Sequence, residues 1–230
     1  LGLVEHLESA VQGLTYDARG TTWVEYYGQT NYSPAAMADK ARLVERFVGR
    51  VRPETAWDLG ANTGVFSRIA AAAGAYTVAG DGDQAAVERH YIDCRERREA
   101  QVLPLVIDLA NPSGRIGWNH EERLSLLDRG PADLVLALGL VHHLALANQV
   151  PFDLVAEFFH RAGRTLLVEF VPRTDSQVVA MLSRMPQLDD RYTQDAFERA
   201  CARRFDVLET VRIAESERRL YLMRGKAGSA

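Results

Sequence analysis

A carboxylate and two glycines stand close together where an apolar strand meets a helix, in the run Trp57-Asp58-Leu59-Gly60-Ala61-Asn62-Thr63-Gly64. Gly60 has no Cβ, so the backbone can turn sharply there and a ligand can approach the main chain. Gly64 lets the following helix pack closely on the strand. Asn62 or Thr63 can cap that helix, whose first N–H groups then favour an anionic group. This turn predicts a binding site for a small molecule.

The same turn indicates which kind of ligand fits. Dinucleotide sites carry Gly-x-Gly-x-x-Gly, in which the second glycine lets the backbone reach the pyrophosphate, and Asn62 occupies that place here. Asp58 adds a negative charge that would repel a pyrophosphate and attract an ammonium group. An amino acid-like ligand therefore fits better than NAD or FAD.

Two further acids follow neighbouring strands. Asp81 ends the strand expected at 75–80, where a carboxylate can accept hydrogen bonds from both ribose hydroxyls. The alternative is an exposed acid that caps the next helix, a role that suits Asp83 better. Asp108 follows the third strand and could accept from an adenine amino group while Leu109 packs on the ring. A turn-forming aspartate is the alternative for Asp108.

Two histidines follow the fourth strand, whose carboxyl end lies beside the first strand at the switch point of a doubly wound sheet. His143, or else His142, is predicted to contact substrate, either as a general base near neutral pH or as a hydrogen-bonding group. Gly139, just before them, is expected to contact the cofactor. Glu169 could orient a histidine or bind substrate. Because a metal site would need further ligands, we predict none.

Aromatic residues precede the first strand, within 23–32. Tyr27, Asn31 and Tyr32 are interpreted either as a lid that faces substrate or as a hydrophobic staple with surface tyrosines. Lys40 is expected to be solvated. In the insertion 111–130, Trp118 could form a wall of a substrate pocket or be a buried anchor.

Strand and helix patterns alternate along the chain and end in a hairpin. This order predicts an α/β fold: a doubly wound, seven-stranded, mostly parallel sheet with an antiparallel C-terminal strand. The helix at 3–14 is expected to cover the sheet. The expected strands are 55–59, 75–80, 102–107, 132–137, 165–171, 205–213 and 219–224, and the other expected helices are 34–50, 65–73, 83–98, 151–162, 176–184 and 194–203.

Composition narrows the class of protein. The 230 residues, 47% of them hydrophobic, are enough for one soluble domain with a full core. A net charge of -4 disfavours nucleic acid as a partner. Two cysteines and the lack of a long apolar run favour a cytoplasmic protein that does not contact a membrane.

The spacing Asp-x-Gly-x-x-x-Gly resembles motif I of the class I S-adenosylmethionine (SAM) dependent methyltransferases, and the resemblance covers about 33–224. More closely, the first turn, Gly130 to Ala137, Val141 to Leu144 and Glu169 to Val178 are similar to bacterial methyltransferases of the nodulation-protein (NoeA-like) group. The resemblance implies a Rossmann-like fold and SAM as the cofactor. It also implies contacts of Gly60, Asn62 and Gly64 with the methionine part, Asp81 with the ribose, and Asp108 with the adenine.

The expected activity is methyl transfer to oxygen or nitrogen of a small-molecule acceptor. His143 or His142 would remove or steer the proton, Glu169 would orient the histidine, and Tyr27 would help to close the site. A non-catalytic SAM-binding domain and a protein or RNA methyltransferase are the alternatives. We expect an N-terminal cap at 1–50, a SAM-binding core at 51–225 and a disordered tail at 226–230, while the oligomeric state is not predicted.

Overall fold

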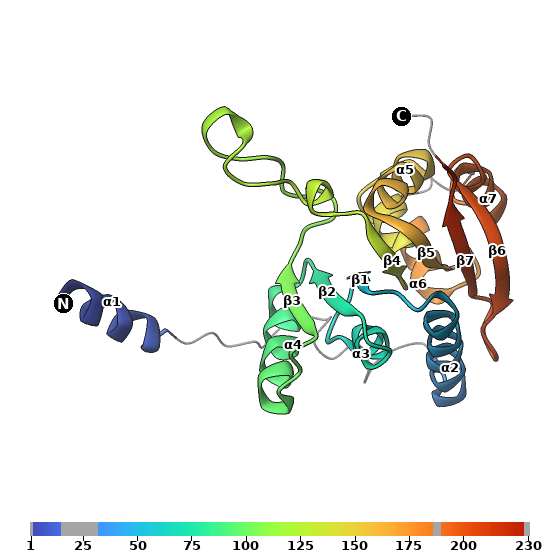
Figure 1. The fold of residues 1–230 in the computed structure, drawn as a ribbon. Coiled ribbons are helices and arrows are strands. Elements are labelled where there is room, and N and C mark those ends of the chain that lie inside the picture. The colour runs from blue at the N-terminus through green and yellow to red at the C-terminus, as the bar shows by residue number, and fades with distance from the viewer. Residues whose placement is uncertain (1, 15–31, 186–189, 228–230) are drawn as a thin grey trace.

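A seven-stranded sheet lies at the centre of the computed structural model, which describes residues 2–14, 32–185 and 190–227 (Figure 1). The strand order is β3-β2-β1-β4-β5-β7-β6, and β7 is antiparallel to both of its neighbours. The class of fold predicted from the sequence is therefore confirmed. The strands are β1 Thr55–Leu59, β2 Tyr76–Asp81, β3 Val102–Val106, β4 Ala132–Ala137, β5 Gly163–Phe170, β6 Phe205–Arg212 and β7 Arg219–Gly225.

Helices cover both faces of this sheet. They pack against it because alternate residues of the central strands point to opposite sides. Leu134 and Leu136 of β4 join the core beneath α2 and α3, whereas Val135 joins the core beneath α5 and α7. The nearly continuous apolar run of β4, interrupted by Asp133, thus reflects burial on both faces, as expected for a parallel strand. The helices beside the strands are α2 Pro34–Val51, α3 Val65–Ala72, α4 Gln84–Arg97, α5 Phe152–Ala162, α6 Ser176–Leu182 and α7 Gln194–Ala202.

The C-terminal hairpin inserts its second strand into the sheet. β7 pairs with β5 on one side and with β6 on the other, and Glu169 lies opposite Leu220. Leu220 and Tyr221 point to opposite faces, so β7 contributes large side chains to the hydrophobic core on each side of the sheet. The hairpin therefore closes the sheet next to the end of β5.

Several caps agree with the sequence. Ser33 caps α2 through the N–H of Ala36, Asp83 caps α4, and Asp175 caps α6. The expectation that Asn62 or Thr63 caps α3 is wrong. The residue before α3 is Gly64 in a left-handed conformation, with no side-chain cap.

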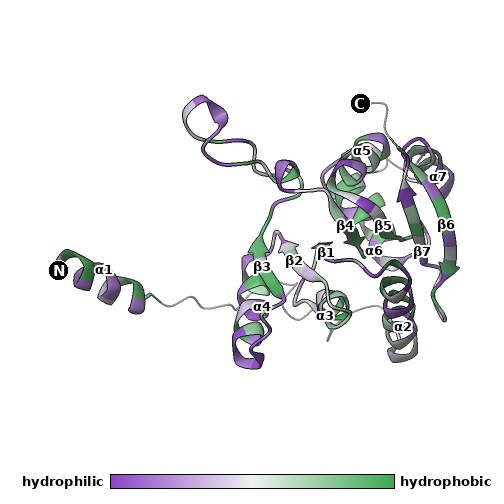
Figure 2. Cartoon of the chain, in the orientation of Figure 1, coloured by the Kyte–Doolittle hydropathy of each residue, from purple (hydrophilic) through white to green (hydrophobic). Residues whose placement is uncertain are grey.

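The N-terminal helix α1, Gly2–Gln12, does not cover the sheet as expected, because none of its residues is buried. Its apolar residues alternate with hydrophilic ones in Figure 2, and Leu3 and Val11 are 75% and 66% exposed. In Figure 1 the helix lies apart from the sheet. No helix in the described part of the chain is long and apolar enough to span a membrane.

The insertion between β3 and β4 also extends away from the sheet (Figure 1). It contains two short helical turns, η2 Trp118–His120 and η3 Leu127–Arg129, and one isolated bridge between Ile116 and Arg123. Trp118 is 85% exposed. The interpretation of Trp118 as a buried anchor is therefore wrong.

Candidate active site

The turn after β1 follows a left-handed path against the segment after β4. Gly60, Asn62 and Gly64 have φ values of 79°, 50° and 80°. The N–H of Gly60 donates to the Gly80 carbonyl at 2.8 Å, which ties the turn to β2. A Cβ on Gly60 would lie 3.3 Å from the side chain of Leu140. The turn and the segment that carries the two histidines are thus neighbours at the switch point, as predicted.

Gly64 is needed for a different contact from the one expected. A Cβ on Gly64 would lie 2.0 Å from the ring of His90 on α4, so the close approach is between the turn and a helix rather than the strand. Burial lowers the pKa of His90 to about 4. The buried ring is therefore neutral at pH 7 and acts as a packing surface for the turn.

Asp58 is a buried carboxyl group beneath the turn. It accepts a hydrogen bond from the hydroxyl of Ser67 at 2.6 Å, and within the described ranges no lysine, arginine or histidine forms an ion pair with it. Burial raises the pKa of Asp58 to about 6. A carboxylate that is buried without a paired cation is well suited to receive an ammonium group from a ligand.

Asp81 holds the turn from the end of β2. Its Oδ2 accepts from the N–H of Asn62 at 2.7 Å, and its Oδ1 accepts from the N–H of Asp83 at 2.9 Å. A carboxylate has about four lone-pair sites, so both oxygens keep acceptor capacity after these bonds. Burial raises the pKa of Asp81. Hydrogen bonds from backbone N–H groups lower this pKa, but burial outweighs them. Asp81 thus shapes the turn and still has capacity to bind a ligand hydroxyl.

Asp108 forms a turn, which is the alternative role that the sequence offered for it. Its Oδ1 accepts from the N–H of Ala110 at 2.9 Å, and the side chain is exposed. Leu109 is half-buried and packs against the core on the α5 side of the sheet. Contact of Asp108 and Leu109 with an adenine ring stays a prediction.

A buried charged cluster lies at the carboxyl end of β5. Glu169 is fully buried, and its oxygens lie 2.6 Å from Nζ of Lys40 and 3.4 Å from Nη1 of Arg218. The hydroxyl of Tyr32 donates to the same carboxylate. Arg218 also pairs with Asp175 at 2.8 Å. We call these five residues the Glu169 cluster.

The cluster keeps Glu169 ionised. Burial raises the pKa of Glu169, but Lys40 and Arg218 outweigh this effect and hold it below its usual value. Burial and the neighbouring carboxylate raise the pKa of Tyr32 far above its usual value, so its hydroxyl remains a donor. A Cβ on Gly139 would lie 3.9 Å from Oε2 of Glu169, so the segment after β4 passes next to this carboxylate.

The two histidines lie in a tight helical segment after β4. His143 begins the π-helical turn η4, His143–Ala147, and its ring centroid lies 4.0 Å from that of His142. Such turns often occur at functional sites. Burial lowers the pKa of His143 to about 4 and that of His142 well below its usual value. Both rings are neutral at pH 7, and a neutral ring can accept a hydrogen bond but is a weak base.

Comparison with known proteins supports the predicted resemblance. No family model matches the chain. The chain is 34% identical over 221 residues to nodulation protein NoeA of Rhizobium meliloti (strain 1021), a match that covers 95% of this chain and 46% of NoeA. The chain therefore spans about half the length of this curated relative.

Solved structures show the same arrangement of strands and helices. N-methyltransferase NodS from Bradyrhizobium japonicum WM9 aligns with a TM-score of 0.61 at 12% identity, over 84% of this chain and 98% of NodS. Magnesium protoporphyrin IX methyltransferase ChlM from Synechocystis PCC 6803, crystallised with bound SAH, aligns with a TM-score of 0.59 at 17% identity, over 89% of this chain and 92% of ChlM. The chain has the class I methyltransferase fold.

Within this methyltransferase fold, sequence reasoning missed part of the Glu169 cluster. Lys40 is 4% exposed, so its expected solvation is wrong. The signal was present, because Lys40 falls in helical register with the buried residues Ala36, Leu43 and Val44. Arg218 sits in a charged turn and had no such signal. Tyr32 is buried, which excludes a surface tyrosine, whereas Tyr27 and Asn31 lie outside the described residues.

Proposed function

We propose that the chain binds SAM at the turn after β1 and transfers its methyl group to oxygen or nitrogen of a small-molecule acceptor. One observation carries the proposal. Asp58 and Asp81 stand at the carboxyl ends of adjacent parallel strands, on either side of a left-handed turn, within the class I methyltransferase fold. ChlM, which has the same fold, was crystallised with bound SAH.

The residues of the turn fit the methionine part of SAM. Asp58 would face the ammonium group, since it is a buried carboxyl without a paired cation among the described residues. Gly60, Asn62 and Gly64 would bring main-chain atoms towards the amino acid. Gly139 would approach from the segment after β4, where a side chain would meet nothing closer than 3.9 Å.

The neighbouring strands fit the nucleoside part. Asp81 would accept hydrogen bonds from the ribose hydroxyls. It would use the lone pairs that do not already accept from backbone N–H groups. Asp108 would accept from the adenine amino group through its exposed carboxylate, and Leu109 would pack on the ring. These assignments follow the order of the strands, because β1, β2 and β3 lie side by side in the sheet.

The chemistry follows from positioning. SAM supplies a methyl group that its sulfonium already activates, so the chain mainly has to align a nucleophile and exclude water. Neutral His143 would accept a hydrogen bond from the nucleophile and so orient its lone pair. Glu169, fixed by Lys40 and Arg218, would keep a carboxylate in one position beside Gly139.

Calorimetry with SAM and with NAD in separate titrations tests the proposal. We expect one molecule of SAM to bind per chain and NAD to give no saturable heat. Binding of NAD but not SAM would overturn the assignment. Incubation with labelled SAM and a panel of small hydroxyl and amine acceptors then separates an enzyme from a domain that only binds SAM.

A further inference from the structure

A cavity lies away from the turn after β1. Its volume is about 340 Å³, which falls within the usual range for small-molecule sites. Residues of η4, of the segment that leads into α5, and of α7 line it. None of the predicted SAM-binding residues does so. The cavity is therefore separate from the proposed cofactor site.

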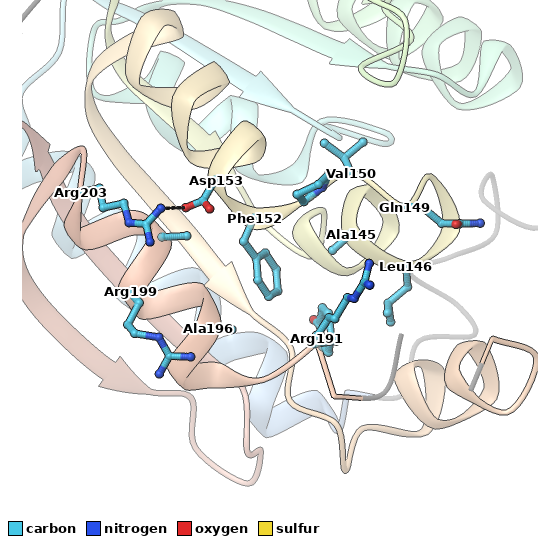
Figure 3. Close-up of a pocket in the computed structure, with 13 residues that line it drawn as sticks. Ala145, Leu146, Gln149, Val150, Phe152, Asp153, Arg191, Ala196, Arg199 and Arg203 are labelled. Atoms are coloured by element: carbon cyan, nitrogen blue, oxygen red, sulfur yellow. Dashed lines mark hydrogen bonds and ion pairs between the residues drawn. The ribbon is translucent and has the colours of Figure 1, made fainter. Parts of the chain in front are cut away.

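The lining combines an apolar body with cations at both ends. Phe152 lies in the middle in Figure 3, Arg191 lies on one side next to Ala145 and Leu146, and Arg199 lies on the other side beside Arg203. The buried ring of Tyr192 also contributes to the wall. A ligand in this cavity would meet rings and methyl groups along its length and guanidinium groups at its ends.

Arginines outnumber acidic residues in the described lining of the cavity. Three arginines and one aspartate of the described residues line it, and the aspartate, Asp153, pairs with Arg203 at 3.0 Å. No ion pair of Arg191 or Arg199 is found among the described residues. This excess stands out in a chain whose net charge is -4. Guanidinium groups bind carboxylate, sulfate and phosphate oxygens through paired hydrogen bonds.

The cavity is connected to the predicted acceptor end of the site through η4. This turn begins at His143 and supplies Ala145 and Leu146 to the cavity wall. Tyr192, which also lines the cavity, stacks on Phe170, the residue that follows Glu169, and its hydroxyl donates to the Val171 carbonyl at 2.7 Å. The same backbone segments thus carry both the proposed catalytic residues and part of the cavity wall.

We propose that this cavity recognises the methyl acceptor through an anionic group carried on an apolar body. This inference rests on the proposed function. Arg191 at one end of the cavity, or Arg199 at the other, binds the anionic group, and the rings of Phe152 and Tyr192 bind the apolar body. The acceptor class is therefore an aromatic or aliphatic molecule with a carboxylate, sulfate or phosphate.

Titration of the full chain with four naphthalene probes tests the inference. The anionic probes are 1-naphthoate, 1-naphthalenesulfonate and 1-naphthyl phosphate, and 1-naphthol is the neutral match. We expect at least one anion to bind about tenfold more tightly than 1-naphthol. Either Arg191→Gln or Arg199→Gln, whichever removes the arginine at the end that binds the anion, should weaken that anion about fivefold to tenfold. Lysine at the same position should lose less, and none of the variants should change the affinity for 1-naphthol.

Arg129→Gln is the matched control, because Arg129 is exposed and lies in η3, outside the cavity. Each variant is also titrated with SAH. If SAH binds but no anion responds to Arg191 or Arg199, or if SAH competes with the anion, the inference is wrong and the proposed function stands. If SAH does not bind, the proposed function fails, and the assignment of the cavity to a methyl acceptor fails with it.

Discussion

The Nζ of Lys40 lies 2.6 Å from Oε2 of Glu169, and the two side chains are 4% and 0% exposed. This ion pair joins the helix that precedes β1 to the carboxyl end of β5. Tyr32, just before that helix, donates to the same carboxylate. The N-terminal part of the domain is thus fastened to the region where the acceptor is proposed to bind.

Lys40→Met should destabilise the fold by about 3 kcal/mol, because it removes one cation from a buried carboxylate. Urea unfolding followed by circular dichroism measures the loss. Arg42→Met is the control, since the Arg42 side chain is 65% exposed in its pair with Asp39, and should cost less than about 1 kcal/mol. Adding Glu169→Gln to Lys40→Met should recover part of the loss. Equal effects of the Lys40 and Arg42 changes would refute the role of the buried pair.

Gly64→Ala should cost about 3 kcal/mol or more, because the new Cβ enters the ring of His90 and the backbone keeps a left-handed φ of 80°. In a His90→Ala background the same change should cost only about 1 to 2 kcal/mol, the part due to the backbone. The two costs are compared by urea unfolding. A cost that is the same in both backgrounds would mean that contact with the His90 ring does not cause the loss of stability.

Asp58→Asn should stabilise the unliganded protein at pH 7.5. The folded pKa of about 6 lies above the ordinary value of 3.8, so the folded state binds more protons than the unfolded state between these values. The contribution of Asp58 to stability therefore falls as the pH rises, by up to about 3 kcal/mol. Asparagine does not ionise, so its gain should be about 1 to 3 kcal/mol at pH 7.5 and smaller at pH 5. A gain that does not depend on pH would show that charge is not its cause.

Three histidines should stay neutral between pH 5.5 and 8, because burial of their rings lowers the pKa of His90 and His143 to about 4 and that of His142 well below 6.5. Unfolding lets them bind protons that the folded state excludes, so these groups make the protein lose stability as the pH falls from 6.5. Nitrogen-15 spectra of the imidazoles, assigned with His→Gln variants, measure this directly. A midpoint near 6.5 for His143 would restore it as a base that titrates near neutrality.

The sequence predicted the sheet well, because strand signals are local. Apolar runs such as 134–137, and the alternation of strands with capped helices, are enough to locate the seven strands along the chain. The turn after β1 was also predictable, since Gly60 and Gly64 both adopt positive φ.

The remaining errors involve partners that lie far apart in the sequence. The helical register of Lys40 indicates burial, but nothing near it in the sequence identifies Glu169 as its partner. Similarly, nothing near Gly64 reveals that the ring of His90 fills the space where its Cβ would be. Trp118 and the apolar side of α1 looked like core residues, but both are exposed.

The affinity for SAH of the parent chain, Asp81→Asn and Asp133→Asn tests the central claim most directly. Asp133 is the matched control, because it also accepts backbone N–H groups, from Glu54 and Thr55, but at the amino-terminal ends of β1 and β4, away from the turn. We predict that the parent binds SAH, that Asp81→Asn weakens binding at least about tenfold, and that Asp133→Asn leaves it unchanged. Absence of SAH binding by the parent, or equal affinity in all three proteins, would contradict the account.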